Sequence, residues 1–456
     1  MGNTSLIAMP KVVKKPQAVS NLESAIVRRV SARGAISRID LARDLGLVPS
    51  TAGIYVDRLI ERGFLAESAK AARGIGRPPV LVELNPKGGR FIGVDVDARQ
   101  VMAASVDFAQ RPLAQACRTL PVRATVERVL GEITRSIAEL IGASDRDVLG
   151  IGLGVPGPID AERGVSRRYE FIRDWVDVPI RERIAASFRA PVFVENNIRA
   201  MALGELWCGQ GRGLRHLVCL GVRSGIGSGI VVDGKLLAGA SNTAGEIGRW
   251  PCPEWQRDAK SFASVARTHS QESPVGHALR GVPRNKVRVS NAPREERHGG
   301  RALQSQRENG EVPLLHALTT ATIEDVASLT AILARAAEEL QRGRTSSLGS
   351  PGEAPTAQRL MEAAGEGDDL ACELIEQAAR IHGRVVHQLA LLLDPECVIV
   401  AGPLSESDAY LATLRQHASR FGGQQIGAKV VRSTLGALGG ALGAAALAFH
   451  YWKPRR

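Results

Sequence analysis

Residues 34–65 read GAISRIDLARDLGLVPSTAGIYVDRLIERGFL and contain two short amphipathic patterns separated by a turn that includes Gly46. In the first pattern Ser37 is placed to cap a helix, and Asp40 follows three residues later, as in a capping arrangement. Its apolar residues, spaced mostly by three or four positions, are Ile36, Ile39, Leu41, Ala42 and Leu45. The second pattern opens at Pro49-Ser50, where a proline is combined with a hydroxyl cap. Its apolar residues are Ala52, Val56, Leu59 and Ile60. The stretch predicts a helix-turn-helix.

The second of these helices, over residues 50–62, is expected to be a recognition helix. Its outward face is left with Ser50, Thr51, Gly53, Ile54, Tyr55 and Arg58. Small polar residues in the first turn of such a helix allow it to enter a major groove and to contact base edges and phosphates. The residues that we expect to contact DNA here, with two from the start of the first helix, are Ser37, Arg38, Ser50, Thr51, Tyr55 and Arg58.

Three neighbouring features favour a winged helix-turn-helix, although any two amphipathic helices joined by a glycine turn show the same short pattern. A helix over 22–30 completes a three-helix core. Residues 63–65 and 80–84 read as the two strands of a wing. The basic loop ARGIGRPP between them carries Arg73 and Arg77, which could reach a phosphate or an A·T-rich minor groove. We predict a DNA-binding domain over residues 19–86, with a double-stranded DNA operator as its partner.

The distribution of charge agrees with this interpretation. Residues 1–90 hold 15 Lys and Arg against 7 Asp and Glu, so this fifth of the chain carries +8 of the formal net charge of +12. A basic excess concentrated on a small domain is the electrostatic footprint of a phosphate-binding surface. A solvated basic face would show the same excess, and charge by itself does not decide between the two.

The length of the chain, 456 residues, allows roughly three domains of ordinary size. The six cysteines lack CxxC spacing and are expected to be reduced thiols of a cytoplasmic protein. No segment approaches the roughly 20 uninterrupted apolar residues that span a bilayer, so no membrane partner is expected. Residues 1–18 are expected to be a disordered lead-in.

From residue 91 onward, strand patterns and helix patterns alternate. The expected strands and hairpins are 91–115, 148–160, 191–197, 216–239 and 396–406, and the expected helices include 125–141, 198–208, 356–364, 369–393 and 436–449. This alternation argues for an α/β architecture with ligand groups at strand ends, where loops converge on a cleft.

Five motifs in this part together resemble the ROK family of repressors and sugar kinases. They are GVPGPID at 154–160, VENNIRAMALGE at 194–205, GIGSGIVVDGKLLAGASNTAGEIG at 225–248, LLDPECVIVAGPL at 392–404 and LGALGGALGAAALA at 435–448. The resemblance implies a two-lobed actin-like, ribonuclease H-like, ATPase-type fold for a sugar-binding domain over 91–449. With a winged helix in front of it, the chain is similar to the transcriptional-repressor branch of the family.

The same resemblance implies that phosphoryl transfer has been lost. Kinase members would hold ATP between the lobes and use the Asp of an Asn-Asp pair as general base, but here the pair is Asn196-Asn197. An amide can orient a sugar hydroxyl and cannot take its proton. Where kinases carry Asp-x-Gly-x-Thr, this chain has DVDAR at 95–99, so Asp97 puts a carboxylate where phosphate oxygens would sit. The adenosine-side loop is AGP at 401–403 instead of a glycine run. We expect neither ATP binding nor enzymatic activity.

The residues that the resemblance assigns to sugar binding are better preserved than those assigned to phosphoryl transfer. Glu246 matches a family carboxylate that accepts hydrogen bonds from sugar hydroxyls, and Asn196 matches a second contact. With Asn197 these are planar polar groups that fork onto adjacent hydroxyls. Asn196 could instead cap the following helix, and Glu246 could sit in a salt bridge. We predict a sugar or sugar-derivative effector at Asn196, Asn197, Glu246 and Arg249.

The structural zinc site of the family is expected to be absent. The resemblance places a His and then three cysteines after AGEIG, but this chain has Arg249 at the His position and only Cys252 nearby. One thiol cannot make a tetrahedral zinc site. The downstream residues His269, His277 and His298 lack ligand spacing. No metal and no other cofactor is expected.

Residues 253–312 interrupt the family pattern, with few apolar residues and with 11 Lys and Arg against 7 Asp and Glu. Such a composition cannot bury enough surface to offset chain entropy, and a disordered or irregular insertion is expected. Two hypotheses stay open. The stretch is a genuine insertion that gates the effector cleft, or it is a translated frameshift, because the family pattern returns at 323–339.

The sequence therefore predicts a sugar-responsive transcriptional regulator, a repressor, that binds DNA as a homodimer or higher homo-oligomer. Its mechanism would be a shift between two arrangements of lobes or subunits, only one of which spaces the winged helices for an operator. Two alternatives remain, namely an active sugar kinase fused to a DNA-binding domain and a regulator that senses no ligand.

Overall fold

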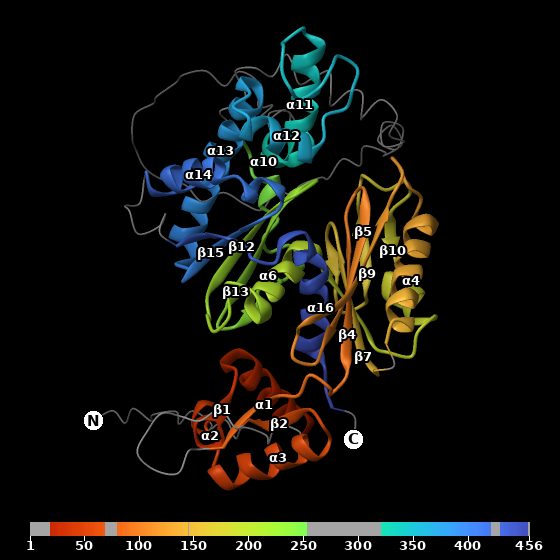
Figure 1. Ribbon diagram of the computed structural model, residues 1–456, viewed down its shortest axis with the longest axis vertical. Helices are drawn as coiled ribbons and strands as arrows, with labels where there is room; N and C mark the ends of the chain where they lie inside the picture. The colour runs from red at the N-terminus through yellow and green to blue at the C-terminus, as the bar shows by residue number, and fades with distance from the viewer. Residues whose placement is uncertain (1–18, 69–79, 145, 253–320, 421–428, 455–456) are drawn as a thin grey trace, which may run out of the picture.

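The computed structural model describes residues 19–68, 80–144, 146–252, 321–420 and 429–454. The chain forms an N-terminal unit at one end of the molecule and two lobes, each built around a five-stranded sheet (Figure 1). The two central helices α6 and α16 lie between the two sheets (Figure 1). The mixed α/β architecture expected from residue 91 onward is therefore present.

The N-terminal unit is a three-helix core covered by a three-stranded sheet of order β1-β3-β2. Its elements are α1 (Val19–Arg33), β1 (Ile36–Ser37), α2 (Arg38–Leu45), α3 (Pro49–Glu61), β2 (Leu65–Ser68) and β3 (Leu81–Leu84). Ser37 caps α2, since its side chain accepts a hydrogen bond from the backbone N–H of Asp40 at 3.1 Å. Gly46 ends the helix in the left-handed conformation, at φ +63°. The predicted N-terminal cap of α2 at Ser37 and its predicted end at Gly46 are both confirmed.

Two details of the predicted helix-turn-helix are wrong. Ser50 does not cap α3, because Val48 precedes the helix, Pro49 is its first residue and no side chain makes the capping bond. Ile39 is 64% exposed although it fits the apolar spacing of α2, since this short helix buries only Leu41 and Ala42 fully. The helix predicted over residues 22–30 corresponds to α1, which is longer and spans Val19–Arg33.

The first lobe has a sheet of order β11-β7-β4-β5-β6, in which β7 runs parallel to β4 and β11. Its strands are β4 (Arg90–Val96), β5 (Gln100–Asp107), β6 (Pro112–Thr119), β7 (Val148–Val155) and β11 (Val192–Asn196). Helix α4 (Val126–Gly142), capped by Thr125, covers its outer face, and a small sheet of β8 (Ile159–Asp160), β9 (Val165–Arg168) and β10 (Val176–Val178) precedes α5 (Ile180–Ala185).

The second lobe has a sheet of order β14-β13-β12-β15-β16. Its strands are β12 (Leu217–Val222), β13 (Ile226–Val232), β14 (Lys235–Leu236), β15 (Cys397–Ala401) and β16 (Val430–Arg432). Its helices are η1 (Ile247–Arg249), α10 (Ile323–Ala327), α11 (Leu329–Gln341), α12 (Ala357–Gly365), α13 (Asp369–Leu393), η3 (Pro403–Glu406) and α14 (Asp408–Ser419). The stretch 323–339, where the family pattern returns, forms two helices, because Ser328 is extended and caps the second.

The central helices are α6 (Asn197–Cys208) and α16 (Gly439–Tyr451), the latter preceded by η4 (Gly436–Leu438). They approach each other so closely that a Cβ on Gly443 would lie 2.4 Å from the carbonyl oxygen of Ala200. On its other side α16 packs against the first sheet, where a Cβ on Gly152 would lie 1.7 Å from the carbonyl oxygen of Ala444. The small residues of α16 permit this close packing on both of its sides.

The N-terminal unit docks on the C-terminal end of α16. The Ser24 hydroxyl donates to the carbonyl oxygen of Trp452 at 3.2 Å, and the Arg28 guanidinium donates to the carbonyl oxygen of His450 at 3.1 Å. The indole of Trp452 meets the ring of Phe64 edge-on, with centroids 4.8 Å apart. The first helix and the entry to the hairpin are therefore held by the last helix of the chain.

A second attachment reaches α1 from the other side. Arg212, in the turn between α6 and β12, donates to the carbonyl oxygen of Ser31 at 3.0 Å. The N-terminal unit is thus bonded both to the end of α16, which packs on the first sheet, and to the segment that leads into the second sheet.

Several predictions fall on residues outside the described ranges, namely the lead-in 1–18, the loop arginines Arg73 and Arg77, the insertion 253–312 and the histidines within it. The six cysteines all lie within the described ranges, and none forms a disulfide. Among the described helices, none combines the length and the hydropathy needed to cross a bilayer.

The packing of α16 predicts opposite effects for two matched substitutions. Gly443→Ala should destabilise the protein by roughly 1–3 kcal/mol, because the methyl group would meet the backbone of α6. Gly131→Ala, in the interior of α4 with open space around it, should stabilise by about 0.5–1 kcal/mol through the higher helix propensity of alanine. Thermal unfolding of both variants checks this, and equal shifts would contradict the close approach.

Candidate functional site

The outward face of α3 is exposed to solvent. Ser50 and Arg58 are exposed, Ile54 is 54% exposed, and the three lie four residues apart on one side of the helix. The opposite side packs Ala52, Val56 and Leu59 into the core. The α3 face therefore presents a hydroxyl, an aliphatic side chain and a guanidinium in a row.

Two other predicted contacts on α3 are partly covered. Thr51 and Tyr55 are half-buried, and the Arg58 guanidinium lies over the Tyr55 ring, 5.4 Å from its centroid. Tyr55 thus packs between the core and Arg58, where it can orient that guanidinium.

Ser37 and Arg38 do not belong to an open contact surface. The Ser37 hydroxyl is buried and is used as the cap of α2, where it also donates to the Asp40 carboxylate at 2.7 Å. Arg38 bonds Asp57 at 2.6 Å and Glu67 at 3.0 Å, so it ties α2 to α3 and to β2. Because both side chains have structural partners, they are not retained among the candidate DNA contacts.

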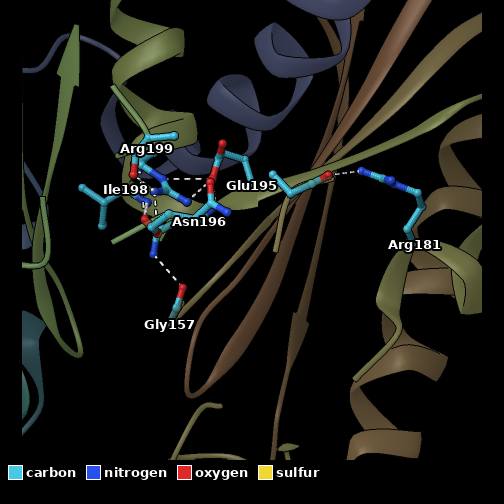
Figure 2. A network of polar contacts seen from close by, with 9 residues as sticks. Gly157, Arg181, Glu195, Asn196, Ile198 and Arg199 are labelled. Carbon is cyan, nitrogen blue, oxygen red and sulfur yellow. Dashed lines mark hydrogen bonds and ion pairs between the residues drawn. The ribbon is translucent and has the colours of Figure 1, made fainter. Parts of the chain in front are cut away.

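The junction of β11 and α6 lies where the two lobes meet, because α6 contacts β7 and β11 of the first sheet and β12 and β13 of the second. Figure 2 shows the polar side chains at this junction. The Asn196 carboxamide oxygen accepts hydrogen bonds from the backbone N–H groups of Ile198 at 3.0 Å and Arg199 at 3.2 Å. Its amide nitrogen donates to the carbonyl oxygen of Gly157 at 3.1 Å. Asn196 is therefore the helix cap that the sequence left open as an alternative, and its polar atoms are committed to the fold.

Asn197 is the better candidate of the two amides for a ligand contact. Its side-chain nitrogen donates to the carbonyl oxygen of Val96 at 3.3 Å, which holds the amide beside the end of β4. The carboxamide oxygen is left to accept a hydrogen bond. A neutral amide at this place can orient a hydroxyl group and cannot deprotonate it.

A buried ion pair that the sequence analysis missed supports this junction. Arg199 bonds the Glu195 carboxylate through Nε at 2.9 Å and through Nη2 at 2.5 Å, and both side chains are less than 5% exposed (Figure 2). The other Nη of Arg199 donates to the carbonyl oxygen of Asn242 at 2.7 Å. Arg199 thus fixes the loop that leads to Glu246. The i, i+4 spacing was visible in the sequence, but the burial was not.

Glu246 and Glu324 form an acidic pair on the second lobe. Glu246 is 27% exposed and lies 3.7 Å from Arg249, which is itself 67% exposed, so this salt bridge is loose. Glu324, at the start of α10, accepts a hydrogen bond from the backbone N–H of Ile226 at 3.1 Å. Burial raises the pKa of Glu324, the Ile226 N–H opposes the shift, and the charge of Glu246 adds to it. Sequence reasoning did not single out Glu324.

An ion-pair cluster joins the two lobes at the end of β4. The guanidinium of Arg223, which follows β12, lies 2.7 Å from the Asp95 carboxylate and 3.1 Å from the Asp97 carboxylate. Burial raises the pKa of Asp95 and the guanidinium opposes that shift. Asp97, which the resemblance puts where phosphate oxygens would sit, is therefore paired with the guanidinium of Arg223, which the sequence analysis did not identify.

Few possible metal ligands lie near the position where the family resemblance places a zinc site. Cys252 is buried, burial raises the pKa of its thiol, and Arg249 points a cation toward Glu246. Within the described ranges, no three His, Cys, Asp or Glu side chains are grouped so that they could hold a metal ion.

Comparison with known proteins gives a family and a set of relatives. The model of the ROK family matches residues 91–266 and 319–450. The chain is 31% identical over 216 residues to a xylose repressor of Caldicellulosiruptor bescii, covering 47% of this chain and 54% of that protein, so it spans about half the length of that relative. It is 25% identical over 399 residues to the DNA-binding transcriptional dual regulator NagC of Escherichia coli, covering 86% of this chain and 83% of NagC.

Solved structures agree on the fold. A ROK family transcriptional regulator, a homologue of the E. coli MLC protein, superposes with a TM-score of 0.66 at 21% identity and covers 94% of this chain and 95% of its own. A ROK family glucokinase from Streptomyces griseus, in complex with glucose and AMPPNP, superposes with a TM-score of 0.57 at 26% identity and covers 79% of this chain and 99% of its own. The family therefore contains both regulators and kinases.

The buried pair at the junction predicts a large effect of its disruption. Arg199→Met should destabilise the protein by about 3–5 kcal/mol, because it leaves the Glu195 carboxylate buried without its cation. Amide exchange should rise around residues 238–246, which lose their bond to Arg199. Arg183→Met, which removes an exposed pair with Glu127, is the control and should melt close to the parent protein. Comparable losses in the two variants would refute a special role for the buried pair.

Proposed function

This chain belongs to the ROK family, and we propose that it is a DNA-binding transcriptional regulator, a repressor, whose operator binding is controlled by a sugar or sugar derivative in the interlobe cleft. The observation that carries the proposal is the α3 face, an exposed row of Ser50, Ile54 and Arg58 on the second helix of a helix-turn-helix. The names of the relatives describe xylose repressors and a DNA-binding regulator. A basic N-terminal part supports the same partner.

In this proposal the N-terminal unit is a winged helix-turn-helix. The first turn of α3 enters a major groove, Ser50 and Thr51 contact base edges or phosphates, and Arg58 contacts a phosphate. A homodimer would present two such helices to half-sites about 34 Å apart, which is one turn of DNA. The loop arginines Arg73 and Arg77 stay proposed contacts to the backbone or the minor groove.

The effector site proposed here is formed by Asn197, Glu246 and Glu324, with Arg249 at its margin. Carboxylates and an amide oxygen accept hydrogen bonds from neighbouring hydroxyls, which is the chemistry of sugar recognition. Glu324 enters the proposal because its carboxylate lies beside Gly248, two residues after Glu246, where a Cβ would come within 2.9 Å of it. Asn196 is withdrawn as a direct contact because its polar atoms already have partners.

Loss of phosphoryl transfer is part of the proposal. Asn197 offers no proton acceptor, and the family resemblance puts the carboxylate of Asp97 where phosphate oxygens would be held. No ATP and no metal cofactor are therefore proposed. An active kinase with a fused DNA-binding domain is the competing function, since a glucokinase shares the fold. A coupled assay of ADP release over a sugar panel separates the two, and we expect no turnover.

The decisive experiment is a pull-down of genomic fragments by the purified protein, repeated with a panel of sugars and sugar phosphates. We expect enrichment of a palindromic site that one sugar abolishes. Sites that resist every sugar would support a regulator that senses no ligand. Absence of any enriched site would overturn the DNA-binding proposal itself.

The contact proposed for Arg58 predicts a change in salt dependence. Arg58→Ala should weaken operator binding and lower the slope of log affinity against log salt by about 1, because one phosphate contact and its released counterion are lost. Arg111→Ala, an exposed arginine of the first lobe, is the matched control and should leave the slope unchanged. Titrations of the Arg58 variant that overlay the parent protein would remove this contact.

The contact proposed for Ile54 predicts sensitivity to thymine methyl groups. An exposed aliphatic side chain on a recognition helix packs best against a thymine 5-methyl in the major groove. Replacing one operator thymine by uracil should weaken binding roughly three- to fivefold, the weight of one buried methyl group. The Ile54→Ala variant should bind both operators equally. If a scan of uracil through the site changes the affinity of neither protein, Ile54 does not read thymine.

A further inference from the structure

Arg223 is the feature of the cleft that the proposed function does not use. It follows β12 of the second lobe, and its backbone is fixed there, since its N–H donates to the carbonyl oxygen of Gly225 at 2.8 Å and its own carbonyl oxygen accepts from Leu329 at 3.0 Å. Its side chain nevertheless leaves that lobe and ends against the carboxylates of Asp95 and Asp97 on the first lobe. The guanidinium of Arg223 thus forms a direct ion pair between the two lobes.

The bond is close to ideal for a buried ion pair. Nη1 and Nη2 each contact one oxygen of Asp95, at 3.0 and 2.7 Å, which is the two-pronged geometry that a guanidinium and a carboxylate favour. The side chains of Arg223, Asp95 and Asp97 are 12%, 3% and 15% exposed. Burial by itself would lower the pKa of Arg223, yet the two carboxylates raise it above its ordinary value. The group is therefore permanently charged.

The surroundings give the two carboxylates no other cation among the described residues. Asp95 lies against the first turn of α16, where a Cβ on Gly440 would come within 2.2 Å of its carboxylate oxygen. Tyr169 faces the same charges, since after its burial the charge of Asp97 is the largest cause that raises its pKa. Without Arg223, two buried like charges would face each other across a site of low dielectric, which is strongly unfavourable.

We propose that Arg223 is an internal cation that takes the place of an external one between Asp95 and Asp97, and that it holds the two lobes together in the absence of any ligand. Paired carboxylate oxygens of this kind are ligands that a divalent cation such as Mg²⁺ accepts. In this chain the position is filled by a side chain of the opposite lobe. Arg223 is therefore a positioning residue that sets the spacing of the lobes.

The position of the bond links it to the N-terminal unit. Asp95 lies at the first turn of α16, and the last turn of the same helix carries the carbonyl groups that bond Ser24 and Arg28. The other attachment, from Arg212 to Ser31, comes from the side of the second sheet. A change in lobe spacing would strain one of these two attachments, since α1 is bonded to both.

The test is a variant whose missing cation can be supplied from solution. Arg223→Ala should lower the melting temperature by about 5 °C or more, because a buried pair loses one partner. Millimolar MgCl₂ should then recover at least half of that loss in the variant and leave the parent protein unchanged. The combination Arg223→Ala with Asp97→Asn should lose the response to Mg²⁺. Arg215→Ala removes an exposed arginine of the second lobe, outside the proposed effector site, and is the matched control.

Lobe spacing is measured on the native cysteines. Cys117 of the first lobe and Cys372 of the second are the two exposed thiols among the six, so spin labels on them report the distance between lobes. We expect one narrow distance for the parent protein, a broader or longer one for Arg223→Ala, and recovery with MgCl₂. A variant that keeps the parent's melting temperature and distance, or one that gains no more from Mg²⁺ than the parent does, overturns the proposal.

A failure of Arg223→Ala to fold is covered by Arg223→Lys, which keeps a cation. The lysine variant should fold and keep the parent's distance, and a lysine variant that also fails to fold would count against the proposal. None of these measurements involves DNA, so they stand or fall separately from the proposed function. Operator affinity of the same variants, measured afterwards, tests the link to the N-terminal unit.

Discussion

The close approach of α16 to its neighbours is the constraint on which the remaining structure depends. Backbone contact with α6 on one side and with the first sheet on the other is possible only because Gly443 and Gly152 have no side chains. Only the helix pair α6 and α16 then separates the two sheets, and the residues at the ends of β4, β11 and β12 lie close enough to bond one another. The same helix then extends beyond the lobes and provides the surface on which α1 docks.

The buried charges between the lobes are neutralised by ion pairs within the protein. Glu195 is neutralised by Arg199, and Asp95 and Asp97 by Arg223, so neither cation is free to attract an anionic ligand. What remains for a ligand is an amide oxygen and the two acidic groups Glu246 and Glu324. Such a site favours hydroxyl donors over phosphate acceptors. The fold is shared with a ROK family glucokinase, and the proposed function includes that the charges at this place no longer suit a nucleotide.

The sequence was informative where structure is local. The caps of α2, the strands from residue 91 onward and the helix at residues 369–393 follow from spacing and from residue type over a few positions. The same reasoning placed Ile39 in the core and Ser50 at a cap, because helix periodicity does not say how much of a short helix the neighbouring elements cover. Glu324 and Arg223 escaped it for a different reason. Their partners lie about one hundred residues away in the chain, and only the packed lobes bring those charges together.

The docking of α1 on the end of α16 has a consequence for biosynthesis. The helix-turn-helix leaves the ribosome early, but the carbonyl groups of His450 and Trp452 that anchor it are made more than 400 residues later. During translation the N-terminal unit is therefore tethered without being oriented, and its final placement waits for the last helix to insert between the sheets. A chain that is interrupted before α16 would lack the attachment to His450 and Trp452 and would keep only the bond from Arg212 to Ser31. The final placement of the N-terminal unit therefore depends on the synthesis of α16.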